Sequence, residues 1–251
     1  YHEEGLDERL LKSFGIDKLP KANIQKWHQV MGDASEKRNQ ITIAMVGKYN
    51  NLEDSYISLI EALNHSSISR FAKVEIKWVD SRKIKAGNVA GKLKSVDAVL
   101  VPGGFGTDGI EGKISAIQYA RENKIPYLGI CLGMQLSVIE FARNVCGIKD
   151  AFSSEFGDTE NPIIGLITEW NNSGIIEKRT KSDDLGGTMR LGSYECKIVK
   201  DSALKDIYGS ETVSERHRHR YEFNANYKEK IEFRGIEDCG RFSRWHFMRS
   251  C

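Results

Sequence analysis

Short apolar runs alternate with amphipathic stretches through the first 150 residues of the chain. Continuous apolar, β-prone runs predict strands buried in a sheet, at 41–47, 74–79, 98–101 and 127–130. Apolar residues at helical spacing predict a helix at 55–67, with Asp54 or Ser55 as its N-cap, and another at about 112–123. Strands and helices that alternate in this way favour right-handed βαβ units and a mostly parallel sheet. The functional site of such a sheet lies at the C-terminal ends of its strands.

Different patterns flank this region. Near the N-terminus, Leu6, Leu10 and Phe14 recur at helical spacing and predict a short amphipathic helix that ends near Gly15. A second short helical stretch at 27–31 lies within a mostly polar segment, 18–39, that we interpret as a linker. Beyond residue 150, short β-prone pieces predict a mixed or antiparallel extension of the sheet, at 163–168, 188–191, 195–199 and 212–223.

Amino-acid composition limits the kinds of binding partner and the cellular compartment that we expect. The chain has 251 residues with 40% hydrophobic content, which suits one large α/β domain with an appendage. A formal net charge of +2 gives no electrostatic reason to expect nucleic acid or an anionic membrane as a partner. The five cysteines form no CxxC pair and no metal-ligand spacing with histidine, so we expect no metal and a reducing, cytoplasmic setting. The first residues lack the apolar core of a signal peptide.

The candidate chemistry centres on residues 125–142, where the pattern predicts a strand, a sharp turn and a helix with Cys131 at the apex. Gly129 and Gly133 suit such an elbow, because Cβ atoms beside the apex would collide with the neighbouring backbone. The unpaired N–H groups and the dipole at a helix N-terminus favour thiolate over thiol. The pattern therefore predicts a nucleophile. A buried structural cysteine is the alternative.

A second glycine-rich turn, PGGFG at 102–106, follows the third predicted strand. It matches neither the GxGxxG nor the GxxxxGK[ST] nucleotide-binding pattern. We interpret Gly103 and Gly104 as positions whose backbone N–H groups face a developing oxyanion beside Cys131, together with the N–H of Leu132. The alternative is a plain turn between a strand and a helix.

Several longer motifs resemble one family. GICLGMQ after PGGFG, with EFGDTEN, LGGTMRLGSYECKI and RHRHRYEFN downstream, closely resembles the glutaminase domain of CTP synthases, which are class I glutamine amidotransferases. The resemblance runs from about residue 1 to residue 231. It implies an α/β, flavodoxin-like fold with a mostly parallel central sheet flanked by helices. It also divides the chain into the end of a synthetase domain with a linker at 1–39, an amidotransferase domain at 40–232, and a tail at 233–251.

The resemblance implies a role for individual residues. Cys131 attacks the side-chain amide of L-glutamine and forms a glutamyl thioester, with Gly104 and Leu132 as the oxyanion hole. Arg220 meets the substrate carboxylate, a task that suits a forked guanidinium. The other residues implied to bind glutamine are Gly133, Met134, Gln135 and Glu155. Without the resemblance, RHRHRY is better interpreted as an exposed charged strand whose arginines and histidines alternate between faces.

The sequence departs from the family in its last part. A cysteine nucleophile of this kind needs a histidine base and a carboxylate, which the family supplies from a late His-Pro-Glu segment. Here the only histidine after RHRHR is His246, and Met248 stands where the glutamate is expected. Synonymous codons can be chosen for 235–251 that, read one base later, encode a segment like the family's continuation. We therefore interpret 233–251 as an aberrant tail, frameshifted or disordered. Asp108 is a further departure, at a position where the family commonly has arginine.

Three functions follow as hypotheses. The first is the glutaminase domain of a CTP synthase, which supplies ammonia for the amination of UTP to CTP. The second is a truncated fragment that binds glutamine but lacks the triad histidine and glutamate; His217 and His219 are the only nearby substitutes for the base. The third is a cysteine peptidase-like hydrolase of related fold, against which LGGTMRLG and RHRHRYE argue. The resemblance implies no cofactor in this domain, with ATP and magnesium belonging to the synthetase domain. It implies L-glutamine and that synthetase domain as partners, and a homo-oligomer, a tetramer, for the full-length enzyme.

Overall fold

A parallel sheet of four strands forms the centre of the structure, in the order β2-β1-β3-β4. The computed structural model describes residues 3–16, 23–28, 39–48, 53–166, 169–172, 175–178, 190–198 and 203–231. The strands of the central sheet are β1 (Asn39–Gly47), β2 (Ala72–Asp80), β3 (Ala98–Val101) and β4 (Tyr127–Gly129). β1 pairs with β2 and with β3, and β3 pairs with β4, all in parallel. The four predicted strands and the mostly parallel sheet are therefore confirmed.

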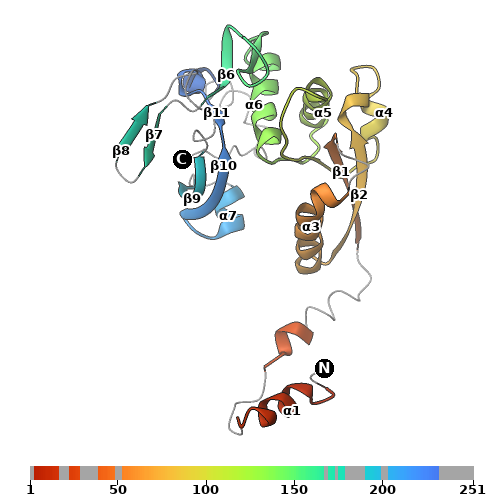
Figure 1. The fold of residues 1–251 in the computed structure, drawn as a ribbon. Helices are drawn as coiled ribbons and strands as arrows, with labels where there is room; N and C mark the ends of the chain where they lie inside the picture. The colour runs from red at the N-terminus through yellow and green to blue at the C-terminus, as the bar shows by residue number, and fades with distance from the viewer. Residues whose placement is uncertain are drawn as a thin grey trace.

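Helices cover both faces of this sheet (Figure 1). They are α3 (Ile57–Ser69), α4 (Val89–Leu93), α5 (Ile110–Glu122) and α6 (Leu132–Asn144). Ala44 and Val46 of β1 belong to a buried cluster with residues of α5 and α6, whereas Met45 packs against residues of α3 that include Leu59 and Leu63. Because neighbouring side chains of the strand point to opposite faces and both faces are covered, the strand is apolar throughout instead of alternating with polar residues.

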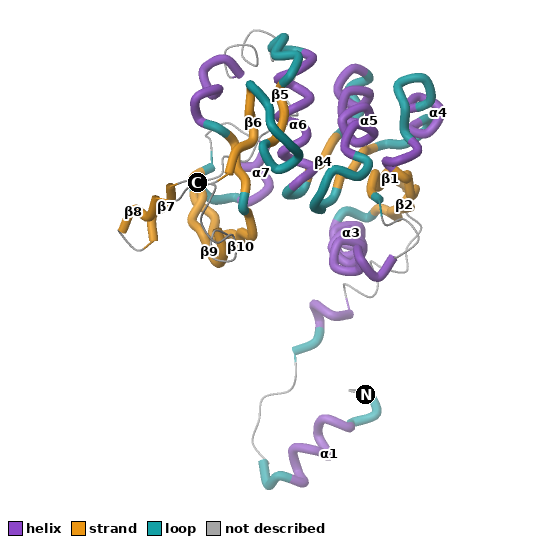
Figure 2. Tube along the Cα trace, turned by 45° about the horizontal axis from the view of Figure 1, so that its top comes forward, coloured by secondary structure: helices purple, strands orange, loops and turns teal. Residues whose placement is uncertain are grey.

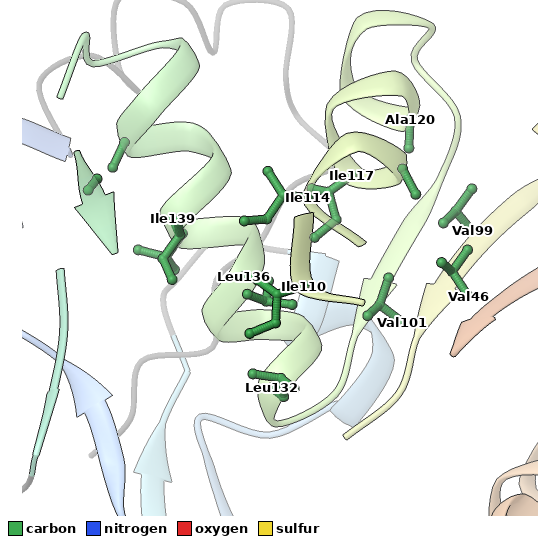
Figure 3. Close-up of a cluster of buried hydrophobic side chains, with 14 of the residues drawn as sticks. Val46, Val99, Val101, Ile110, Ile114, Ile117, Ala120, Leu132, Leu136 and Ile139 are labelled. Carbon is green, nitrogen blue, oxygen red and sulfur yellow. The ribbon is translucent and has the colours of Figure 1, made fainter. Parts of the chain in front are cut away.

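The larger core lies between α5, α6 and the sheet. Figure 3 shows the apolar side chains of the two helices directed toward each other and toward Val99 and Val101 of β3. The helical residues at this contact are Ile110, Ile114 and Ile117 of α5 and Leu132, Leu136 and Ile139 of α6, each no more than 5% exposed. Their spacing of three or four positions places them on one stripe of each helix. This contact fixes the first turn of α6, where the candidate nucleophile lies.

A buried ion pair also joins α5 to α6. Arg121 Nη2 lies 2.8 Å from Glu140 Oε1, and the Glu140 side chain is 1% exposed. We expect Glu140→Gln to lower the free energy of unfolding by about 3 kcal/mol, because the guanidinium loses a buried carboxylate partner. Urea denaturation followed by circular dichroism measures this change. Glu122→Gln is the matched control: Glu122 also contacts Arg121 but is 52% exposed, so its loss is expected to cost less than about 1 kcal/mol. If the two variants lowered the free energy of unfolding equally, the buried Arg121–Glu140 ion pair would not be the stabilising contact between α5 and α6.

The remaining strands form three further sheets. They are β5 (Ala151–Ser153), β6 (Asn161–Leu166), β7 (Glu169–Asn172), β8 (Ile175–Lys178), β9 (Arg190–Lys197), β10 (Thr212–His219) and β11 (Tyr221–Phe223), in the orders β11-β6-β5, β10-β9 and β7-β8. β5 pairs with β6 in parallel and β11 pairs with β6 antiparallel, so the mixed pairing agrees with the prediction. The predicted strand at 212–223 is two strands, because the chain bends at Arg220 and continues in a different sheet.

One of two predicted helices is confirmed, and the other begins differently from the prediction. The first, α1 (Leu6–Ser13), is confirmed; it lies apart from the rest of the fold in both views (Figures 1 and 2), with Phe14 74% exposed. Before α3, the short 3-10 helix η1 (Glu53–Tyr56) occupies the expected cap positions. Capping of α3 by Asp54 or Ser55 is therefore wrong. Tyr56 is buried and its ring centroid lies 5.7 Å from that of Trp78, so packing against β2 sets where the helix begins.

Three further elements of the structure are short. They are η2 (Ser81–Lys83), α7 (Ala203–Tyr208) and η4 (Ala225–Tyr227). A helical turn at 25–28 overlaps the stretch predicted at 27–31, most of which lies outside the described residues. The predicted tail at 233–251 also lies outside them. In the part of the chain that is described, every helix is too short or too polar to cross a membrane.

Candidate active site

The predicted elbow is present, and Cys131 is its apex. β4 ends at Gly129, Cys131 is the N-cap residue of α6, and helical geometry begins at Leu132. The backbone of Cys131 has φ 53° and ψ −107°, a region that residues with a Cβ rarely adopt. Backbone hydrogen bonds hold this conformation: Ile130 N donates to Val101 O at 3.0 Å, and Gly133 N donates to Ile130 O at 2.9 Å. The thiol is thereby fixed at the carboxyl edge of the sheet.

The two flanking glycines are required by close backbone contacts. A Cβ added to Gly133 would lie 2.0 Å from the carbonyl oxygen of Val101, and one added to Gly129 would lie 2.6 Å from the carbonyl carbon of Gly133. Tyr127 adds a further restraint, because its hydroxyl donates to Gly133 O at 2.7 Å. The collision argument made from the sequence therefore holds at both positions.

The PGGFG turn, 102–106, lies directly beside the elbow. A Cβ added to Gly103 would lie 3.4 Å from the Cβ of Cys131, and one added to Gly104 would lie 3.6 Å from Leu132 Cδ2. The structure thus brings together the two glycine-rich turns that the sequence singled out. Leu132 and Gly133 are buried and Met134 is half-buried.

Charged side chains from distant segments meet at the same loop. The backbone N–H of Gly106 donates to Glu155 Oε1 at 3.4 Å, and Lys48 Nζ donates to the carbonyl oxygen of Phe105 at 2.6 Å. Burial raises the pKa of Glu155, while the hydrogen bond from Gly106 and the positive charges of Arg220 and Lys48 oppose that rise. Glu155 and Arg220, both predicted to bind glutamine, therefore lie close enough for the charge of Arg220 to act on Glu155.

Gln135 has a structural contact that the sequence did not reveal. Its side chain is 6% exposed, and its Nε2 donates to the carbonyl oxygen of Tyr221 at 2.8 Å. The amide nitrogen therefore ties the first turn of α6 to β11. The predicted contact of Gln135 with glutamine stays a prediction.

The pKa of the Cys131 thiol is raised above its ordinary value. Burial is the largest cause and the negative charge of Glu155 adds to it, while a hydrogen bond from the N–H of Leu132 acts in the opposite direction. The N–H at the helix N-terminus favours the thiolate, as predicted, but burial and the charge of Glu155 outweigh it.

Removing the charge of Glu155 is expected to make the thiol more reactive. Because the carboxylate disfavours the thiolate, Glu155→Gln lowers the thiol pKa and raises the thiolate fraction at about pH 8. We expect iodoacetamide to alkylate Cys131 about two- to fivefold faster. The effect is modest because solvent partly screens the interaction between the Glu155 charge and the thiolate. Glu160→Gln, an exposed change in the same loop region, is the control and leaves the rate unchanged. A slower or unaltered rate in Glu155→Gln would contradict this interpretation.

The proposed substitutes for a histidine base lie elsewhere. Among the described residues, no imidazole forms a hydrogen bond with Cys131 Sγ. His217 Nε2 lies 3.8 Å from Cys196 Sγ, and its ring stacks on Tyr194 with centroids 5.4 Å apart. The ring of His219 lies 5.3 Å from that of His217. Both histidines are therefore packed within the β9-β10 pair.

Two lysines at the site were missed by sequence reasoning. Lys48 follows β1 and Lys113 lies in the first turn of α5, and both approach the PGGFG loop. Neither belongs to a pattern that points to chemistry, because a lysine on an amphipathic helix is ordinarily solvated. Within the described ranges, no group of three or more His, Cys, Asp or Glu side chains is placed to hold a metal ion.

The fold and the elbow define a class of protein. The chain belongs to the class-I glutamine amidotransferase family, whose model matches residues 51–242. Within that family it is similar to the CTP synthases of Brucella canis and Chelativorans sp., with 49% identity over 240 residues, or 96% of this chain and 44% of each relative. The chain thus spans less than half the length of these relatives.

A solved structure supports the same relation. The glutaminase domain of Trypanosoma brucei CTPS with bound acivicin superimposes with a TM-score of 0.69 and 38% sequence identity, over 78% of this chain and 72% of that chain. The resemblance inferred from GICLGMQ, LGGTMRLG and RHRHRYE, and the flavodoxin-like α/β fold that it implied, are confirmed.

Proposed function

We propose that this chain is the part of a CTP synthase that binds L-glutamine and attacks its side-chain amide with Cys131. One observation carries the proposal: a cysteine at a strained strand-to-helix elbow lies against the Gly103–Gly104 loop, and Glu155, which accepts a hydrogen bond from Gly106 of the same turn, lies within reach of the positive charge of Arg220. A nucleophile, two backbone donors and a pair of opposite charges are what recognition and cleavage of an amino-acid amide need.

The chemistry proceeds through a thioester. The thiolate of Cys131 adds to the amide carbon of glutamine, and the electron pair of the carbonyl bond moves to its oxygen. The backbone N–H groups of Gly104 and Leu132 stabilise that oxyanion. The carbon–nitrogen bond then breaks, its electron pair moves to the nitrogen, and that nitrogen takes up the proton that the thiol gave up, so ammonia leaves. Water then hydrolyses the thioester to glutamate and the free thiol. Arg220 binds the substrate carboxylate, and Glu155 accepts hydrogen bonds from the α-amino group.

The ammonia serves a second domain in the proposed enzyme. The relatives to which this chain is similar are named as CTP synthases, and the chain covers 44% of their length. We propose that a synthetase domain uses ATP and magnesium to aminate UTP with the ammonia released here. No residue of this chain is assigned to the nucleotides or to the metal ion.

This chain by itself is proposed to react at Cys131 without rapid turnover. Its sequence has no His-Pro-Glu segment, and among the described residues no imidazole hydrogen-bonds to the thiol. An amide leaving group must gain a proton as it departs, whereas an activated ester leaves without one. Acylation by an activated ester therefore needs only the thiolate and the oxyanion site.

Two assays on the same protein test both proposals. With the p-nitrophenyl γ-ester of glutamic acid, we expect a burst of p-nitrophenolate equal to the amount of protein and the corresponding glutamyl adduct in the intact mass. With L-glutamine, we expect ammonia release no faster than that of the Cys131→Ala variant. Absence of the burst would reject the assigned site. Ammonia release well above the Cys131→Ala background would show that a base is present and reject the limitation on turnover.

A further inference from the structure

A buried lysine lies beside the loop that carries Gly104. Lys113 is in the first turn of α5, and the residue is 2% exposed. A Cβ added to Gly104 would lie 3.8 Å from Lys113 Nζ and 3.6 Å from Leu132 Cδ2. The ammonium group therefore lies next to Gly104, one of the two residues assigned above to the oxyanion hole, and the Leu132 side chain packs against the same glycine.

Among the residues that the structure describes, no carboxylate contacts the ammonium group of Lys113. In the described part of the chain, Lys113 Nζ forms neither an ion pair nor a hydrogen bond. Burial lowers its pKa to about 8, and repulsion by Lys48 adds to that effect, while Asp108 opposes it. A buried ammonium without a partner is costly to a folded protein. A negative charge that forms at the adjacent loop would relieve this cost.

We propose that Lys113 is a positioning residue for the oxyanion site, and that its ammonium stabilises the negative charge that develops beside Gly104 when Cys131 attacks a glutamyl carbonyl. The inference rests on the proposed function and deepens it. Lys113 acts from behind the loop, without touching the substrate. Its positive charge favours the anionic intermediate over the neutral substrate, which is the requirement for lowering a barrier.

Two reagents separate this role from the reactivity of the thiol. Iodoacetamide forms a carbon–sulfur bond with the thiolate as iodide leaves, and no oxyanion appears. The p-nitrophenyl γ-ester of glutamic acid also reacts with the thiolate, but its carbonyl oxygen becomes an oxyanion before p-nitrophenolate leaves with its electron pair. Both reactions consume the same thiolate. The ratio of the acylation rate to the alkylation rate therefore reports the oxyanion site and cancels the ionisation of Cys131.

Neutralising Lys113 is expected to lower this ratio. Removal of a direct oxyanion donor slows catalysis about 10²- to 10³-fold, so we expect about a tenfold fall for Lys113→Met, which acts through the loop. Alkylation is expected to stay within about twofold of the unsubstituted chain, because thiolate formation does not need Lys113. Lys113→Arg retains the charge and keeps most of the ratio. Lys85→Met removes an exposed lysine and leaves the ratio unchanged.

The pH profile of the ratio gives a test that needs no variant. Lys113 is charged below its pKa of about 8 and neutral above it, so the ratio is expected to fall as the pH rises through that value. Lys113→Met and Lys113→Arg are expected to show no such step. The charges that act on Lys113 are those of Lys48 and Asp108. The first turn of α5 and the elements packed against α5 also carry these titratable or charged groups: Glu111, Arg82, Lys83, Lys92, Tyr127, Glu140, Arg143 and Cys131. The two-reagent ratio cancels the last of these.

These measurements can reject the role of Lys113 without rejecting the proposed reaction of Cys131. A reduced ratio in Lys113→Met with unchanged alkylation, together with a step near pH 8 in the unsubstituted chain, supports the role of Lys113. Acylation of the unsubstituted chain with a ratio that is flat across this range, or unchanged in Lys113→Met, overturns the role of Lys113 alone. Alkylation without any acylation of the unsubstituted chain rejects the proposed function, and the inference falls with it. If Lys113→Met does not fold, the pH profile of the unsubstituted chain decides.

Discussion

Alanine at position 133 is expected to destabilise the fold by about 3 kcal/mol or more, at the upper end of what overpacking costs. The added Cβ would lie 2.0 Å from the carbonyl oxygen of Val101. That oxygen belongs to the central sheet and accepts the hydrogen bond from Ile130 N, so it has no freedom to move aside. The first turn of α6 must then shift away from β3, and the contacts of Leu132 and Leu136 with the core weaken. Urea denaturation followed by circular dichroism measures the change.

A second glycine provides the matched control. Gly91 lies in α4 with nothing within 4 Å of the place its Cβ would occupy. Gly91→Ala is expected to raise stability by up to about 1 kcal/mol, because alanine favours the helix and restricts the unfolded chain. A Gly133→Ala variant as stable as Gly91→Ala would show that the elbow does not pack against β3 as described.

Replacing Cys131 with alanine is expected to abolish covalent labelling of the chain by acivicin. The solved structure that this chain matches contains acivicin in a glutaminase domain, and the reagent carries the amino-acid end of glutamine next to an electrophilic carbon. In the proposed function Arg220 and Glu155 recognise that end, while the thiol of Cys131 is the nucleophile. Without the sulfur no bond can form. Intact-mass spectrometry measures the labelled fraction.

Two buried cysteines serve as controls for selectivity. Cys146 and Cys196 are buried, and Cys196 Sγ lies 3.8 Å from His217 Nε2 within the β9-β10 pair. We expect Cys146→Ala and Cys196→Ala to be labelled like the unsubstituted chain. Labelling that persists in Cys131→Ala and disappears in Cys196→Ala would move the nucleophile to the second cysteine–histidine pair.

The central sheet could be predicted because its signal is local. Strands buried on both faces produce continuous apolar runs, so β1, β2, β3 and β4 follow directly from the sequence. The elbow could be predicted for the same reason, since the two glycines beside Cys131 and the stripe of α6 all lie within one short stretch. The start of α3 could not be predicted, because the contact of the Tyr56 ring with the Trp78 ring joins residues far apart along the chain.

The site was only partly accessible to sequence reasoning. The motifs identified Glu155 and Arg220, but nothing local revealed that Glu155 approaches the thiol closely enough to raise its pKa. The sign of that pKa shift depends on burial and on the charge of a residue distant in the sequence, whereas a helix terminus by itself lowers the pKa of a thiol. Lys113 escaped notice because a lysine in a helix is ordinarily exposed, and only the folded arrangement of α5 against the loop buries it.

Protection of Cys131 by glutamine tests the central claim most directly, because the claim joins one thiol to one substrate. The measurement is the rate at which iodoacetamide modifies Cys131, identified by peptide mapping, with and without saturating L-glutamine; D-glutamine is the control. The account predicts that L-glutamine slows the modification of Cys131 strongly, and that D-glutamine does so much less. Equal rates with and without L-glutamine would show that the substrate does not bind over this thiol and would contradict the account.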